Sequence, residues 1–325
     1  MPRYRLLPAL GAIPVLIAAA LGGMIAFGTA APPPPLASVY NATRAMPPCG
    51  SLPPLKRYQA RDGAELAYRA YDGSPGEVVV LIHGSTSSAC SMHLLAEALA
   101  ATGDTIYALD VRGHGQSGRR GDIDYRGQLD DDLVDFVTTV APRHPGHHLT
   151  LIGFSAGGGF ALHFAASVKG ELFDRYVLLA PYLGPWAPTN QPRNGGWAVP
   201  YLPRAYALAA LDAIGVHWFE SLPIVAYARR PDPTVPPPTY SYRLSRNFGA
   251  DLDFRDDFRR AHRLIIVMVG GADDQMIADR YVPAIAPIRP DIPVKIIPGV
   301  GHIGIIMAPD ALQAIRAALA SPAGA

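Results

Sequence analysis

The sequence predicts an α/β fold in which a mostly parallel sheet is flanked by helices. Short apolar runs rich in β-branched residues alternate with amphipathic segments of helical period, a pattern typical of such sheets. Apart from Glu77 at its start, the run at 77–82 is apolar, and the run at 264–269 is apolar throughout, as strands buried on both faces are. Residues 153–157 read G-F-S-A-G between an apolar run and an Ala-rich segment, which predicts a strand, a sharp turn and a helix.

The expected elements follow the chain in a regular order. A turn at Asp62-Gly63 joins two strands of a hairpin. We expect the hairpin strands at 56–60 and 65–71, further strands at 77–82, 105–110, 147–152, 176–180, 264–269 and 294–297, and helices at 92–101, 128–140, 158–168 and 308–320.

The stretch from Pro181 to about Arg260 interrupts this alternation of strands and helices. It contains all three tryptophans, several tyrosines and the Pro-rich run 231–238. We interpret it as an insertion of short helices and loops that forms a cap. The α/β domain is thus expected over residues 55–325, with its cap at about 181–260. The cap aromatics could form a small core of their own or a wall that binds substrate.

The N-terminus is predicted to be a targeting or anchoring segment. Leu6 to Phe27 carries no charge and is long enough to cross a bilayer as a helix. Arg3 and Arg5 precede it, which places the N-terminus in the cytoplasm and the rest of the chain outside. A cleaved signal peptide is the alternative, with Gly28-Thr29-Ala30 as a small-residue site. Both interpretations put the remaining chain on the extracytoplasmic (periplasmic) side, membrane-anchored or exported.

We therefore assign residues 1–27 to a signal anchor or signal peptide, and residues 28–54 to an extended Pro-rich linker. Cys49 and Cys90 would face an oxidising compartment. They could form a disulfide or remain two unrelated thiols. The net charge of +1, with 17% charged residues, gives no basic surface for nucleic acid.

The chemistry is expected to centre on Ser155. Gly153 and Gly157 allow the tight backbone that exposes the hydroxyl at the apex of the turn. A serine is a weak nucleophile alone, so it needs a base and a group that orients the base. The N–H of Ala156, at the start of a helix, can face a developing oxyanion.

The best candidate base is His302, in a loop directly after a predicted strand. The orienting acid should follow the preceding strand, in the run Gly270 to Gln275. We favour Asp274, counted from Gly271, and Asp273 satisfies the same count from Gly270. The second oxyanion donor is expected from the N–H of Ser85, after His83 and the small Gly84.

Together these segments resemble the α/β-hydrolase superfamily. The resemblance covers about residues 56–320. The segment Arg-Gly-His-Gly-Gln-Ser-Gly at 112–118 and the Asp-Asp-Asp-Leu run at 130–133 resemble the branch that contains monoglyceride lipases, lysophospholipases and serine aminopeptidase-like hydrolases. The resemblance implies a Ser-Asp-His hydrolase that needs no cofactor.

The sequence thus predicts a serine hydrolase that cleaves carboxylic esters, with lipid-like or other apolar acyl esters favoured. A prolyl-type aminopeptidase or amidase is one alternative, in which Glu220 of the cap could bind a substrate amine; a solvated charge is the more ordinary role for such a residue. A non-catalytic binding module on the same fold is another. The histidines show no metal-ligand spacing, so we expect no metal. His83 and His114 are expected to bond to their own loops, and His163 to be a packing residue.

Overall fold

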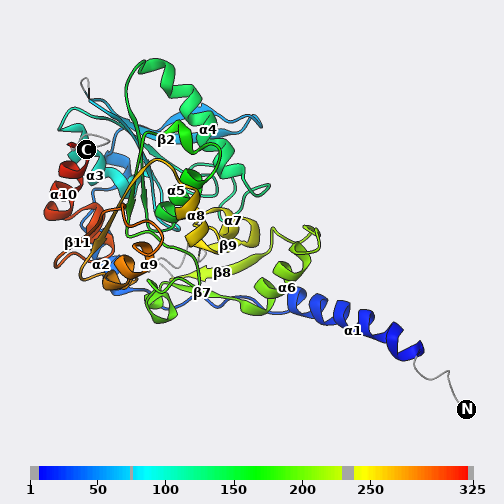
Figure 1. Ribbon diagram of the computed structural model, residues 1–325. Helices are drawn as coiled ribbons and strands as arrows, with labels where there is room; N and C mark the ends of the chain where they lie inside the picture. The colour runs from blue at the N-terminus through cyan, green and yellow to red at the C-terminus, as the bar shows by residue number, and fades with distance from the viewer. Residues whose placement is uncertain (1–6, 74–75, 229–237, 321–325) are drawn as a thin grey trace, which may run out of the picture.

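A central eight-stranded sheet organises the chain (Figure 1). The computed structural model describes residues 7–73, 76–228 and 238–320. The strand order is β1-β2-β4-β3-β5-β6-β10-β11. Pairs β1/β2 and β2/β4 are antiparallel, and the others are parallel. The bounds are β1 (Lys56–Gln59), β2 (Glu65–Tyr71), β3 (Val78–Ile82), β4 (Thr105–Leu109), β5 (Leu149–Phe154), β6 (Arg175–Leu179), β10 (Leu264–Gly270) and β11 (Val294–Ile297). The predicted α/β fold and its mostly parallel sheet are confirmed.

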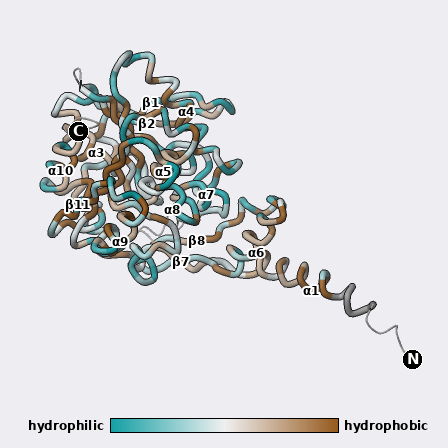
Figure 2. Tube along the Cα trace, in the orientation of Figure 1, coloured by the Kyte–Doolittle hydropathy of each residue, from teal (hydrophilic) through white to brown (hydrophobic). Residues whose placement is uncertain are grey.

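Helices cover both faces of the sheet. Figure 1 shows α3 and α10 on one side, and α4, α5 and α8 on the other. Their bounds are α3 (His93–Ala100), α4 (Gln128–Val140), α5 (Ala156–Ala166), α8 (Phe254–Arg260), α9 (Tyr281–Ile285) and α10 (Pro309–Ala320). Every residue of β3 is buried, and Figure 2 shows the hydrophobic residues concentrated along the central strands. Burial of this apolar surface is the main favourable contribution to folding.

The chain between β6 and β10 forms the insertion that the sequence indicated. It holds a second, antiparallel sheet in the order β7-β8-β9, which the sequence did not predict. Its elements are a short 3-10 turn (Pro192–Gly196), β7 (Ala198–Pro200), α6 (Leu202–Asp212), β8 (Pro223–Tyr227), β9 (Thr239–Ser241), α7 (Tyr242–Asn247) and α8. We call this insertion the cap. Most of the Pro-rich run, 231–237, lies outside the described residues.

The N-terminal segment differs from the expectation. Within the described part of the chain, no helix has both the length and the apolar character that crossing a membrane requires, so the expected spanning helix is not supported. Helix α1 (Leu7–Ala26) extends from the body and packs beside α6 (Figure 1). Ile25 is buried there against Leu208. The guanidinium of Arg204 also donates hydrogen bonds to the carbonyl oxygens of Ile25 and Gly28, both at 2.8 Å.

The expected extended linker is also wrong in part, because it contains helix α2 (Ala37–Arg44) and a 3-10 turn (Cys49–Ser51). A disulfide joins Cys49 to Cys90, with the Cα atoms 5.6 Å apart. Arg69 supports this junction by donating to the carbonyl oxygen of Cys49 at 3.1 Å. The linker is therefore covalently joined to the turn that follows β3.

Candidate active site

Ser155 lies at the apex of the turn between β5 and α5. Its φ of 54° and ψ of −116° fall outside the regions that ordinary residues prefer. A Cβ added to Gly153 would lie 2.1 Å from the carbonyl oxygen of Gly157, and one added to Gly157 would lie 2.4 Å from that of His83. Both glycines are therefore required by close backbone contacts. A strained conformation of this kind costs about 1–3 kcal/mol and persists only where the surrounding structure holds it.

His302 and Asp273 complete a buried chain of hydrogen bonds with this serine. His302 Nε2 lies 3.0 Å from Ser155 Oγ, and His302 Nδ1 lies 2.7 Å from Asp273 Oδ2. The second carboxylate oxygen, Oδ1, accepts the N–H groups of Gln275 at 2.8 Å and Met276 at 2.7 Å. Because Oδ1 is fully engaged by the backbone, Oδ2 is left to receive Nδ1–H, and Nε2 is then free to accept the serine proton.

The preference for Asp274 as the orienting acid is wrong. Asp274 is exposed, whereas Asp273 is buried and contacts His302. The reason is the geometry of the turn after β10. Strand β10 runs through Gly270, and the N–H of Asp273 donates to the Gly270 carbonyl at 3.2 Å. Because the turn begins at Gly270, the side chain of Asp273 points inward and that of Asp274 points to solvent.

The loop after β3 places Gly84 and Ser85 beside the serine. A Cβ on Gly84 would lie 3.2 Å from Ser155 Cβ, so only glycine fits there without displacing its neighbours. His83 Nε2 accepts the N–H of Val111 at 3.2 Å, and Nδ1 therefore carries the proton and donates to the Gly84 carbonyl at 2.7 Å. A trans peptide holds its C=O and N–H on opposite sides. Holding that carbonyl therefore also helps to set the direction of the Ser85 N–H.

The N–H groups of Ser85 and Ala156 have no acceptor among the residues that the structure describes. Ala156 follows Ser155 in the chain, and Ser85 follows Gly84, which lies beside Ser155, so both N–H groups are available to an anionic oxygen. Burial lowers the pKa of His83, so its ring is neutral and supports this loop without adding charge. The expectation that His83 bonds to its own loop is confirmed.

The cap reaches the same loop through aromatic side chains. Trp197 Nε1–H donates to Ser85 Oγ at 2.8 Å, and Tyr240 Oη accepts the N–H of Thr86 at 2.5 Å. Trp186 and Trp218 are instead 69% and 82% exposed, so they form neither a core nor a wall at this site. Sequence reasoning missed Tyr240, because nothing local marks a tyrosine that contacts a loop 154 residues away.

A cavity of about 120 Å³ adjoins this loop. It is lined by Thr86, Ser87, Ser88, Gly113, His114, Gly115, Arg120, Gly121, Pro238, Thr239 and Tyr240. Hydroxyl groups and a guanidinium make much of this lining polar.

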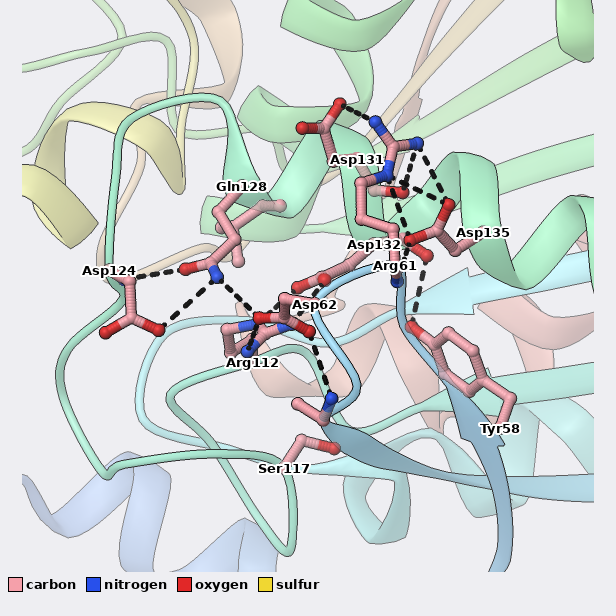
Figure 3. A network of polar contacts seen from close by, with 12 residues as sticks. Tyr58, Arg61, Asp62, Arg112, Ser117, Asp124, Gln128, Asp131, Asp132 and Asp135 are labelled. Atoms are coloured by element: carbon pink, nitrogen blue, oxygen red, sulfur yellow. Dashed lines mark hydrogen bonds and ion pairs between the residues drawn. The ribbon is translucent and has the colours of Figure 1, made fainter.

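The loop that carries His114 is held by a polar network (Figure 3). Arg112 is buried and donates to both oxygens of Asp132 on α4, at 2.8 and 2.7 Å. It also pairs with Asp62 of the β1–β2 turn at 2.9 Å. Arg112 thus joins a hairpin turn, a helix and its own loop. Burial raises the pKa of Asp132 despite this partner, so the buried carboxylate depends on the guanidinium.

His163 forms an ion-pair cluster instead of the expected simple packing. Its ring nitrogens lie 3.2 Å from Asp130 and 3.0 Å from Asp251, which join α5 to α4 and to the end of the cap. Burial opposes the positive charge, but the hydrogen bonds to these two carboxylates outweigh it and raise the pKa of His163 to about 10. The imidazolium form is therefore the one present near neutral pH.

Among the residues that the structure describes, two groups of side chains have the composition of a cation site. One contains His163 with Asp251 and Asp257, and the other contains Glu220 with Asp212 and His217. An arginine already forms ion pairs with the carboxylates of each group: Arg260 with those of the first and Arg126 with those of the second. Glu220 is buried and 3.0 Å from Arg126, so it is neither a solvated charge nor an open carboxylate for a substrate amine.

The sheet order and the elbow at Ser155 define an α/β-hydrolase. A family model described as serine aminopeptidase, S33, matches residues 73–302, more than half of the chain. The chain therefore belongs to this family of hydrolases, within the monoglyceride lipase-like branch of the superfamily.

Curated relatives share part of the sequence. A monoacylglycerol lipase of Mycolicibacterium smegmatis is 34% identical over 122 residues, which cover 37% of this chain and 43% of that protein. An N-formylmaleamate deformylase of Pseudomonas putida is 35% identical over 121 residues, covering 37% and 42%. The matched stretches thus span less than half the length of these relatives.

Solved structures share the fold over most of the chain. A soluble variant of monoglyceride lipase from Saccharomyces cerevisiae aligns with a TM-score of 0.61 at 18% identity, covering 83% of this chain and 96% of that one. A bacterial membrane phospholipase A aligns with a TM-score of 0.56 at 17% identity, covering 96% and 97%.

Proposed function

We propose that the protein hydrolyses carboxylic esters through an acyl-enzyme on Ser155. The hydrogen-bonded chain from Ser155 through His302 to Asp273 is the observation that carries the proposal. A non-catalytic module on this fold would have no need to keep these three side chains buried in mutual contact. The likeness to a monoacylglycerol lipase supports an apolar acyl ester as the substrate.

The reaction would proceed in two halves. Ser155 Oγ attacks the acyl carbon while its proton passes to His302 Nε2, and the Ser85 and Ala156 N–H groups hold the oxyanion. The bond to the alcohol oxygen then breaks as His302 returns the proton to the leaving alcohol. Next, His302 takes a proton from water, the resulting hydroxide attacks the acyl carbon, and the acid leaves as Ser155 regains its proton.

The test is a panel of p-nitrophenyl esters of increasing acyl length, run with the wild type and with Ser155→Ala. We expect turnover by the wild type, fastest on longer acyl chains, and no turnover by the variant. A circular-dichroism melt of both proteins serves as the folding control. Equal turnover by Ser155→Ala would contradict the proposal.

Amide hydrolysis is the second candidate, favoured by the family description and by the deformylase relative. The engagement of Glu220 by Arg126 argues against an aminopeptidase, because the carboxylate is not free to bind a substrate amine. Prolyl and aminoacyl p-nitroanilides assayed beside the esters separate the two. A higher kcat/KM on the anilides would replace the ester proposal.

We also propose that the catalytic domain works outside the cytoplasm. The Arg3 and Arg5 pair before an uncharged segment supports export, and so does the Cys49–Cys90 disulfide, since such bonds persist in oxidising compartments. A C-terminal alkaline phosphatase fusion tests this. We expect phosphatase activity in intact bacterial cells, and an inactive fusion in the cytosol would contradict export.

A further inference from the structure

The cap contacts the loop that carries the Ser85 N–H at two consecutive residues. The indole N–H of Trp197 binds the Ser85 hydroxyl, and the Tyr240 hydroxyl binds the Thr86 N–H. Trp197 directly precedes β7, and Tyr240 lies within β9. Both outer strands of the cap sheet therefore reach one short segment of the hydrolase body.

That segment needs support from outside, because Thr86 has a φ of 58°. A non-glycine residue in this left-handed region costs about 1–2 kcal/mol. Its N–H donates to Tyr240, so the Tyr240 proton is free to go to Nε2 of His114, which Tyr240 contacts. His114 Nδ1–H then donates to the Arg112 carbonyl at 3.2 Å. Each donor in this series of hydrogen bonds, from the Thr86 N–H to the Arg112 carbonyl, has an acceptor, so the direction of every hydrogen bond in the series is fixed.

The three cap strands act on the loop as one unit. The ring of Tyr227 in β8 lies between the other two rings, with its centroid 5.9 Å from that of Trp197 and 4.7 Å from that of Tyr240. Strand β8 pairs with both β7 and β9. A displacement of the cap sheet would therefore move both contacts on Ser85 and Thr86 together.

We propose that Trp197 and Tyr240 are positioning residues through which the cap sheet sets the direction of the Ser85 N–H. Stabilisation of the oxyanion then depends on the contacts of the cap sheet with Ser85 and Thr86. The proposal rests on the ester hydrolysis proposed above. Neither side chain touches the reacting atoms. Their contribution therefore belongs to the transition state and should change kcat more than KM.

The first test removes one hydroxyl, in Tyr240→Phe, and uses Tyr206→Phe as the matched control. Tyr206 is a cap tyrosine that is 52% exposed. Losing an oxyanion donor outright costs about 100-fold to 1,000-fold in kcat, so misdirecting one should cost roughly 10-fold. For Tyr240→Phe we expect that loss in kcat and little change in KM. The affinity for a boronic acid that mimics the tetrahedral intermediate should fall by the same factor. Tyr206→Phe should match the wild type.

The second test is a double-mutant cycle of Trp197→Phe with Ser85→Ala, which removes the donor and the acceptor but keeps the backbone N–H. We expect the double variant to lose no more activity than Trp197→Phe alone. Independent, additive losses would overturn the proposal, as would a rise in KM at constant kcat, which marks a substrate-binding wall.

The rate at which a fluorophosphonate labels Ser155 is measured in all variants. If the wild type reacts with neither probe nor ester, the proposed function fails. If the wild type reacts and Tyr240→Phe reacts equally fast, only the positioning role fails.

Discussion

Replacing Asp273 with asparagine should abolish most of the activity while leaving the site almost unchanged in shape. In the structure, Asp273 Oδ1 accepts two backbone N–H groups at 2.8 and 2.7 Å, and Oδ2 faces His302 Nδ1 at 2.7 Å. An asparagine keeps both backbone bonds only if its oxygen takes the place of Oδ1. Its NH₂ group then faces Nδ1, which must accept, so the proton moves to Nε2.

With Nε2 protonated, His302 cannot take the proton of Ser155. An orienting carboxylate changed to an amide in this way lowers kcat by about 10⁴-fold, which corresponds to roughly 5 kcal/mol in the activation free energy. The assay is kcat for a p-nitrophenyl ester, with Asp274→Asn as the matched control. We expect a loss near that size for Asp273→Asn and nearly full activity for Asp274→Asn. The reverse order would refute the reasoning.

Three further predictions concern stability, each measured by urea unfolding. The pKa of His163 is raised above the unfolded value, so its ion pairs stabilise the fold fully below about pH 6.5 and lose that contribution as the pH rises through about 10. The free energy of unfolding should therefore fall over this range of pH. In His163→Gln, that fall should be smaller. Cys49→Ser with Cys90→Ser should cost about 4 kcal/mol, given the sequence separation of 41, and a loss equal to that of reducing the wild type would confirm the cause. Asp132→Ala should cost about 3 kcal/mol by leaving the buried Arg112 without its main partner, and an unchanged midpoint would show that Asp62 suffices.

Much of the fold follows from local patterns. The continuous apolar run of β3 and the period of α4 predict their elements closely, because a strand buried on both faces and an amphipathic helix each leave a distinct signal in the sequence. The elbow is equally local, since Gly153, Ser155 and Gly157 lie within five residues and each glycine has a close backbone contact.

The remaining features depend on contacts between distant segments. The choice of Asp273 over Asp274 turns on where β10 ends, and a shift of one residue reverses which side chain points inward. The contact of Tyr240 with Thr86 joins a cap strand to a body loop, and no spacing along the chain indicates it. The partners of His163 come likewise from α4 and the cap, so a ring that a helical pattern assigns to packing is instead charged.

The central claim is that Ser155 becomes acylated during turnover. The most direct measurement mixes the wild type with a slowly deacylating p-nitrophenyl ester, quenches it in acid, and locates the added mass by peptide mass spectrometry. The account predicts one acyl group on the peptide that contains Ser155, formed in step with a stoichiometric burst of p-nitrophenol. Turnover without an adduct there, or with an adduct on another residue, would contradict it.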